Sequence, residues 1–110
     1  MKTSSAKSKG RRLQNFVAER LQGFFGWSAE DCKPAVMGES GVDIKLGSRE
    51  KAQFPYDIEC KNVEKINIWQ SLKQAEENTE EGRKPLLVFT RNRSPTYVVM
   101  RWEDFEESLL

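Results

Sequence analysis

Two short segments that read as neighbouring β-strands constrain this chain most strongly. They span residues 41–46 and 56–62, and together they carry Asp43, Glu59 and Lys61. Side chains two residues apart in a strand point to the same face, so Glu59 and Lys61 share a face. Carboxylates on adjacent strands supply the hard oxygen ligands that a divalent cation prefers. The pattern predicts a site where a bound metal activates a water at a phosphate, with Lys61 adding a compact positive charge.

An acid followed two residues later by lysine occurs three times: at Asp31–Lys33, Asp43–Lys45 and Glu59–Lys61. The first string follows Ser28, a plausible helix cap, and runs into Pro34, which predicts a poor strand. The second lies on a good strand but has no carboxylate strand upstream. Only the string at Glu59 has an acid on a preceding strand and a helix-like segment after it. The alternative is that Asp43, Glu59 and Lys61 are solvated strand residues with a surface ion pair.

The composition excludes several kinds of chemistry. The 110 residues include no histidine, which rules out histidine general bases and histidine-containing zinc sites, and two cysteines cannot form a four-thiolate site alone. The chain has no run of 18 apolar residues and no signal-peptide core, so we expect no membrane span and a cytoplasmic protein. Cys60, inside a strand beside the acids, is expected to contribute a backbone carbonyl rather than a thiol.

The net charge of +1 conceals a strong segregation of charge. Residues 1–12 and 83–101 are basic and contain no acid, whereas residues 76–81 and 103–107 carry clustered acids. Separated basic segments suit contact with a phosphate backbone. The candidate contacts with nucleic acid are Lys9, Arg11, Arg12, Arg91 and Arg93. The alternative is an ordinary solvated surface with a flexible basic tail.

The coarse order of elements predicts an α/β domain. Residues 1–8 read as a disordered basic arm, and residues 9–110 as a single domain. Helical spacing and turn residues predict the order helix, strand, strand, helix, strand, strand, helix along the chain. The strand–helix–strand unit of residues 56–90 implies that its two strands are parallel and joined by a crossover. We therefore expect a mixed central sheet of about four or five strands flanked by helices. Trp69, on the apolar stripe of the helix that starts after Asn67, is expected to lie in the core; the alternative is an aromatic surface on which a nucleobase stacks.

With this order of elements, the chain resembles the PD-(D/E)xK nuclease superfamily over nearly its full length. More narrowly, it is similar to small Holliday-junction resolvases and compact phage-encoded endonucleases. The residues that carry the resemblance are Lys9–Gly10, Ser40, Asp43, Glu59–Lys61 and Gln74–Glu76.

The resemblance implies roles for these residues. Asp43 and Glu59 would bind the metal together with the Cys60 carbonyl, and the metal would be Mg²⁺, with Mn²⁺ as a substitute. Lys61 would position or activate the attacking water and support charge on the phosphate. Ser40 and Gln74 would be auxiliary catalytic contacts near the scissile phosphate.

The sequence departs from the resolvases in its first helix. Where they carry a glutamate, about five residues after the Lys–Gly pair, this chain has Gln14. At about 100° per residue, Gln14 lies roughly 60° from the centre of the helix's apolar face, and Glu19 lies roughly 160° away. Gln14 is therefore the candidate to reach the catalytic site, although it brings no charge to a second metal.

The resemblance implies a Mg²⁺-dependent DNA endonuclease, selective for branched or otherwise structured DNA, that acts in recombination or repair. The alternatives are a nicking or flap endonuclease of the same fold, or a nucleic-acid-binding module without turnover. Because one chain offers a single site and a junction must be cut on two strands, we expect a homodimer. Its interface candidates are Val98, Met100, Trp102, Phe105, Leu109 and Leu110.

Overall fold

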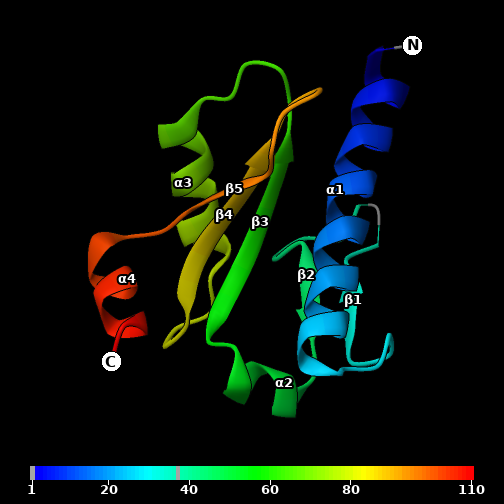
Figure 1. Cartoon of the computed structure of the whole chain (residues 1–110). Coiled ribbons are helices and arrows are strands. Elements are labelled where there is room, and N and C mark those ends of the chain that lie inside the picture. The colour runs from blue at the N-terminus through cyan, green and yellow to red at the C-terminus, as the bar shows by residue number, and fades with distance from the viewer. Residues whose placement is uncertain (1, 37) are drawn as a thin grey trace.

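The computed structural model describes the backbone of residues 2–36 and 38–110 as an α/β fold, with helices on both faces of a sheet (Figure 1). The helices are α1 (Lys2–Phe25), α2 (Ser48–Gln53), α3 (Ile68–Asn78) and α4 (Trp102–Ser108). The strands are β1 (Cys32–Pro34), β2 (Ile44–Leu46), β3 (Tyr56–Asn62), β4 (Lys84–Thr90) and β5 (Tyr97–Val99). The expected fold class is confirmed.

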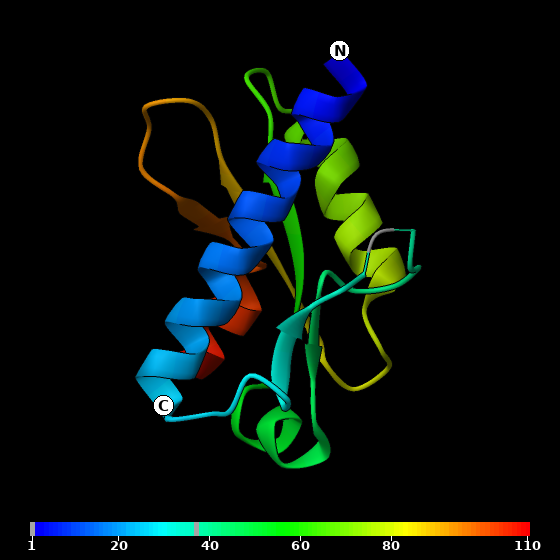
Figure 2. The same ribbon diagram turned by 90° about the vertical axis from the view of Figure 1, so that its right-hand side faces the viewer.

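The strands form two sheets that meet beside Asp43. The larger sheet has the order β3-β4-β5, with β3 and β4 parallel and β4 and β5 antiparallel. The parallel crossover through α3 agrees with the sequence prediction. β1 and β2 form a separate antiparallel pair, and the Asp43 N–H donates to the Ile58 carbonyl of β3 at 3.0 Å. Figure 2 shows α1 running along both sheets, with the β1–β2 pair beside its C-terminal half.

The strand β1 corrects one expectation. The segment around Cys32 was predicted to be a poor strand because it runs into Pro34, yet it pairs with β2. Proline is tolerated here because it is the last residue of a strand at the edge of a sheet, where its missing N–H breaks no interior ladder. Cys32 itself is fully buried in the core, and that burial holds the short strand in place.

The core lies between α1 and the two sheets. Leu13, Val17 and Ala18 of α1 are buried against residues of β1–β4. Two further apolar residues of α1, Phe16 and Phe24, are exposed, so the buried face of the helix is narrower than its apolar pattern suggests. None of the helices that the structure describes is long and apolar enough to cross a membrane.

The start of α1 also differs from the sequence expectation. A disordered arm was expected over residues 1–8, but α1 already begins at Lys2; Met1 lies outside the described residues. The segment holds no proline or glycine before Gly10 to interrupt the helix. The Ser8 hydroxyl accepts a hydrogen bond from Arg12 one turn later, at 3.3 Å.

The orientation of α3 overturns the prediction for Trp69. Asn67 caps the helix as expected, since its side chain accepts from the Gln70 N–H. However, Ser71 and Ala75 are the buried residues of α3, whereas Trp69 is 82% exposed. The helix thus turns a small, partly polar stripe toward the sheet and leaves its largest apolar side chain in solvent. This orientation brings the end of α3 over β3.

Candidate active site

Asp43 is held at the point where the two sheets meet. Its backbone N–H donates to the Ile58 carbonyl, and its Oδ2 accepts a hydrogen bond from the Cys60 N–H at 2.7 Å. The side chain of Asp43 therefore takes the place of a backbone acceptor along the free edge of β3. This bond fixes the Asp43 carboxylate beside the strand segment that carries Glu59.

Glu59 is anchored by two polar partners from different elements. It is only 4% exposed, its Oε1 accepts from the Asn78 Nδ2 at 3.3 Å, and its Oε2 lies 3.5 Å from the Lys61 Nζ. The Lys61 side chain retains 28% exposure, so its ammonium can still meet a ligand. Sequence reasoning missed Asn78; the signal available was its position one helical turn after Gln74.

The pKa values of both acids are raised above their usual range, although lysine ammonium groups lie nearby. Burial raises the pKa of Asp43, against the lowering effects of the Cys60 N–H and of Lys61. Burial also raises the pKa of Glu59, and the neighbouring Asp43 charge raises it further. Because each carboxylate is desolvated and the two repel each other, a bound cation would relieve both penalties.

The donor set fits a magnesium ion. The N–H and C=O of one strand residue point to the same side of the strand, so the Cys60 carbonyl faces the edge at which Asp43 lies. Among the side chains that the structure describes, no three His, Cys, Asp or Glu residues come together to form a metal cage. Mg²⁺ needs no such cage, since it binds one or two carboxylates and completes its shell with water and phosphate oxygens.

Gln14, rather than Glu19, lies beside this site. Gln14 and Asp43 line the same cavity of about 270 Å³, together with Arg11 and Glu39. Glu19 is exposed on another side of α1. Glu39 forms an ion pair with Lys45 at 3.3 Å and accepts from the Val36 N–H.

Ser40 and Gln74 are both exposed. Ser40 lies in the loop before β2, and its carbonyl accepts from the Lys45 Nζ at 3.4 Å. Gln74 lies one turn before Asn78, roughly 40° from it around α3. Gln74 therefore lies on the flank of α3 beside Asn78, which donates a hydrogen bond to Glu59.

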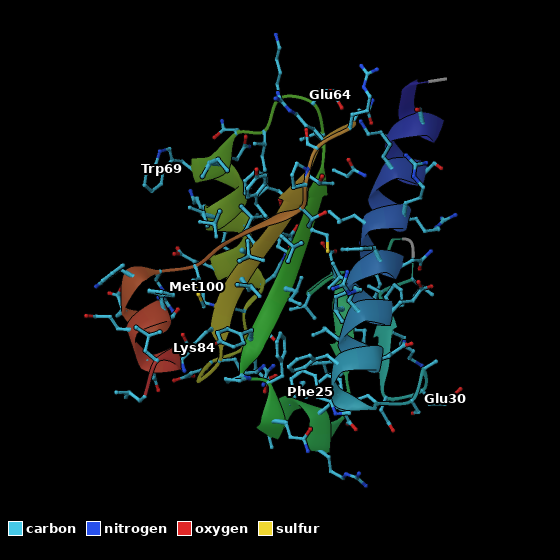
Figure 3. All side chains as sticks on the ribbon, in the orientation of Figure 1. Phe25, Glu30, Glu64, Trp69, Lys84 and Met100 are labelled. Atoms are coloured by element: carbon cyan, nitrogen blue, oxygen red, sulfur yellow. The ribbon has the colours of Figure 1, made fainter. Side chains whose placement is uncertain are left out.

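The basic residues expected to contact nucleic acid gather at one end of the molecule. Arg11 and Arg12 are exposed on α1, and Arg91 and Arg93 are exposed in the β4–β5 loop. Lys9 differs, because its ammonium forms an ion pair with Glu64 at 3.1 Å. Glu64, labelled in Figure 3, also accepts from the Asn92 N–H at 2.8 Å, and so links the start of α1 to the β4–β5 loop.

Arg83 belongs to the interior, although it lies in a basic segment expected to face phosphate. Its Nε donates to Asp57 Oδ1 at 2.7 Å, and the side chains of the pair are 10% and 7% exposed. The same guanidinium donates to the carbonyls of Lys51, Phe54 and Tyr56. Its five donors suit this role of joining α2, β3 and the turn before β4.

Comparison with known proteins agrees with this geometry. The model of one protein family, described as "Phage putative PDDEXK endonuclease", matches residues 5–109. No curated protein and no solved structure gave a significant match. The matched range covers nearly the whole chain and contains Asp43, Glu59 and Lys61. The chain therefore belongs to this PDDEXK endonuclease family of phages, which makes it a nuclease with the restriction-endonuclease-like fold.

Proposed function

We propose that this protein is a divalent-metal-dependent DNA endonuclease that uses Asp43, Glu59 and Lys61. The observation that carries the proposal is the pair of desolvated, mutually repelling carboxylates beside one ammonium. A surface ion pair would not bury Glu59 or hold Asp43 on a backbone N–H. In the host cell such a phage enzyme would work in the cytoplasm.

Each residue has a separate task in the proposed reaction. Asp43, Glu59 and the Cys60 carbonyl would hold Mg²⁺, which supplies an activated water and offsets charge on the phosphate. Lys61 would donate hydrogen bonds to the phosphate or to the attacking water. Asn78 is a positioning residue, because its amide fixes one oxygen of Glu59. Gln14 would orient a water in the cavity that it shares with Asp43.

The DNA backbone would lie across the basic end of the molecule. The exposed side chains of Arg12, Arg91 and Arg93 are available for phosphate contacts. Arg11 lines the cavity beside Asp43 and would contact the phosphates nearest the cut. The Lys9 ammonium would contact a phosphate only after its ion pair with Glu64 is broken.

Branched DNA is the substrate that we infer, with two chains acting as a homodimer. Exposed apolar side chains gather at the C-terminal end of the chain, an arrangement typical of an interface: Val98, Trp102, Phe105, Leu109 and Leu110. Met100, predicted for the same interface, packs partly buried against the core instead. Sedimentation at micromolar concentration, with and without junction DNA, tests the dimer. A monomer in both conditions would favour the alternative of a nicking or flap endonuclease.

Cleavage of a DNA panel tests the proposal directly. Linear duplex, nicked, flap and four-way-junction DNA should be incubated with Mg²⁺, with Mn²⁺ and with EDTA. Asp43→Asn and Glu59→Gln should abolish cleavage and keep DNA binding, because the basic residues hold the backbone. Glu30→Gln, which changes an exposed acid away from the site, is the matched control. Undiminished cleavage in EDTA would rule out a metal-dependent mechanism. DNA binding without cleavage of any substrate would favour the alternative of a non-catalytic binding module.

A further inference from the structure

A groove of about 680 Å³ lies beyond the C-terminal ends of β3 and β4. The loop between β3 and α3 forms one wall, and the loop between β4 and β5 forms the other. The two loops are joined at the base of the groove, where the Val63 N–H donates to the Thr90 carbonyl at 3.3 Å. The volume falls within the range of about 300–1,000 Å³ that small-molecule sites occupy.

An aromatic pair forms the floor of this groove. The rings of Phe89 and Tyr97 stack with their centroids 5.8 Å apart and their planes 27° apart. Tyr97 nevertheless remains 54% exposed. An aromatic side chain stacked on one neighbour and open to solvent offers a surface on which another flat ring can stack.

The aromatic pair is in register with the candidate catalytic lysine. Lys61 of β3 pairs with Phe89 of β4, and Phe89 pairs with Tyr97 of β5. Residues directly opposite one another on neighbouring strands project to the same face of a sheet. Lys61, Phe89 and Tyr97 therefore form a row on the face that also carries Glu59. Phe89 and Tyr97 line the groove, and Lys61 is the residue paired with Phe89 on the neighbouring strand.

The charge around the groove suits a phosphate-linked ligand. Lys65 and Arg91 are exposed and line it from opposite loops. The one acid in the lining, Glu64, is already bound by Lys9 at 3.1 Å and by the Asn92 N–H at 2.8 Å. The rim therefore presents positive charge, while the floor is aromatic.

We propose that this groove binds an unpaired nucleobase of the DNA strand, stacked on Tyr97 next to the phosphate that Lys61 contacts. The identity of the ligand as DNA rests on the proposed function. A base inside a duplex is stacked on its neighbours and cannot enter the groove, whereas a base at a branch point or in a single strand can. The groove would therefore select DNA with unpaired nucleotides beside the cut.

Binding in EDTA tests this proposal without any cleavage. The probes are a single-stranded oligodeoxynucleotide that carries one 2-aminopurine and the same strand fully paired in a duplex. Wild-type protein should quench 2-aminopurine fluorescence in the single strand. Tyr97→Ala should remove the quenching and raise the Kd for the single strand about 5- to 150-fold, with little change for the duplex. Tyr97→Phe should behave as wild type, because it keeps the ring.

Phe24→Ala provides the matched control. Phe24 is 82% exposed but lies next to Phe25, at the other end of the molecule from Glu64 (Figure 3). This variant should bind both probes as the wild type does. If Tyr97→Ala binds the single strand and quenches as the wild type does, the inference is overturned, even if the enzyme cleaves DNA. If quenching depends on Tyr97 while no substrate is cleaved with Mg²⁺, the base site stands and the proposed catalytic function fails.

Discussion

Replacing Arg83 by alanine should destabilise the fold by about 3–5 kcal/mol, because it leaves a buried carboxylate without its partner. Arg83 donates to Asp57 at 2.7 Å and to the carbonyls of Lys51, Phe54 and Tyr56 at 2.8–3.0 Å. With the guanidinium gone, those oxygens lose their partner in a region closed to most solvent. A domain of this length is stable by about 5–15 kcal/mol, so a large share of that stability should vanish.

Thermal and urea unfolding, followed by circular dichroism, measure this loss. At about 4 °C per kcal/mol for a domain slightly over 100 residues, Arg83→Ala should lower the Tm by roughly 12–20 °C. Arg83→Lys should rescue little, since one ammonium cannot reach the four acceptors in the geometry of a planar fork. Arg93→Ala, an exposed arginine, should change stability by less than about 0.5 kcal/mol. A loss below about 1 kcal/mol for Arg83→Ala would refute the structural role.

Three further predictions concern the catalytic site. Lys61→Ala should slow cleavage at least about 100-fold with DNA binding in EDTA retained, as judged by single-turnover kinetics; wild-type turnover would make Lys61 an ordinary surface partner of Glu59. Gln14→Ala should lower the cleavage rate and Glu19→Gln should not, and the reverse ranking would mean that the acid of α1 acts instead. Mg²⁺ at ten times its Kd should stabilise the wild type by about 1.4 kcal/mol in a thermal shift assay. Asp43→Asn should not be stabilised by Mg²⁺, and its Tm without metal should be no lower than that of the wild type. If Mg²⁺ stabilises Asp43→Asn as much as the wild type, Asp43 is not a metal ligand.

The sequence was sufficient for the parts of the fold that local patterns determine. The strands around Glu59 and Val88, the cap at Asn67 and the parallel crossover all follow from alternation, turn residues and helix signals. The likeness to a nuclease could also be inferred from the spacing of the acids, since strand geometry fixes which side chains share a face.

Tertiary packing decided what the sequence could not. The stripe containing Trp69 has the stronger apolar periodicity, yet α3 turns Ser71 and Ala75 to the sheet and places Asn78, at its end, within hydrogen-bond reach of Glu59. Arg83 reads as surface charge because its partner, Asp57, is 26 residues away in the chain. Such long-range polar pairs have no local signature.

The hydrogen bond from Cys60 to Asp43 makes one amide proton a natural sensor of the site. That proton is protected from exchange with solvent only while the carboxylate oxygen accepts it. A cation that draws on the same oxygen must share it with the amide, which changes the resonance and the exchange rate of Cys60. The Cys60 amide signal in a nuclear magnetic resonance spectrum should therefore report whether a cation is bound at Asp43, without substrate or turnover.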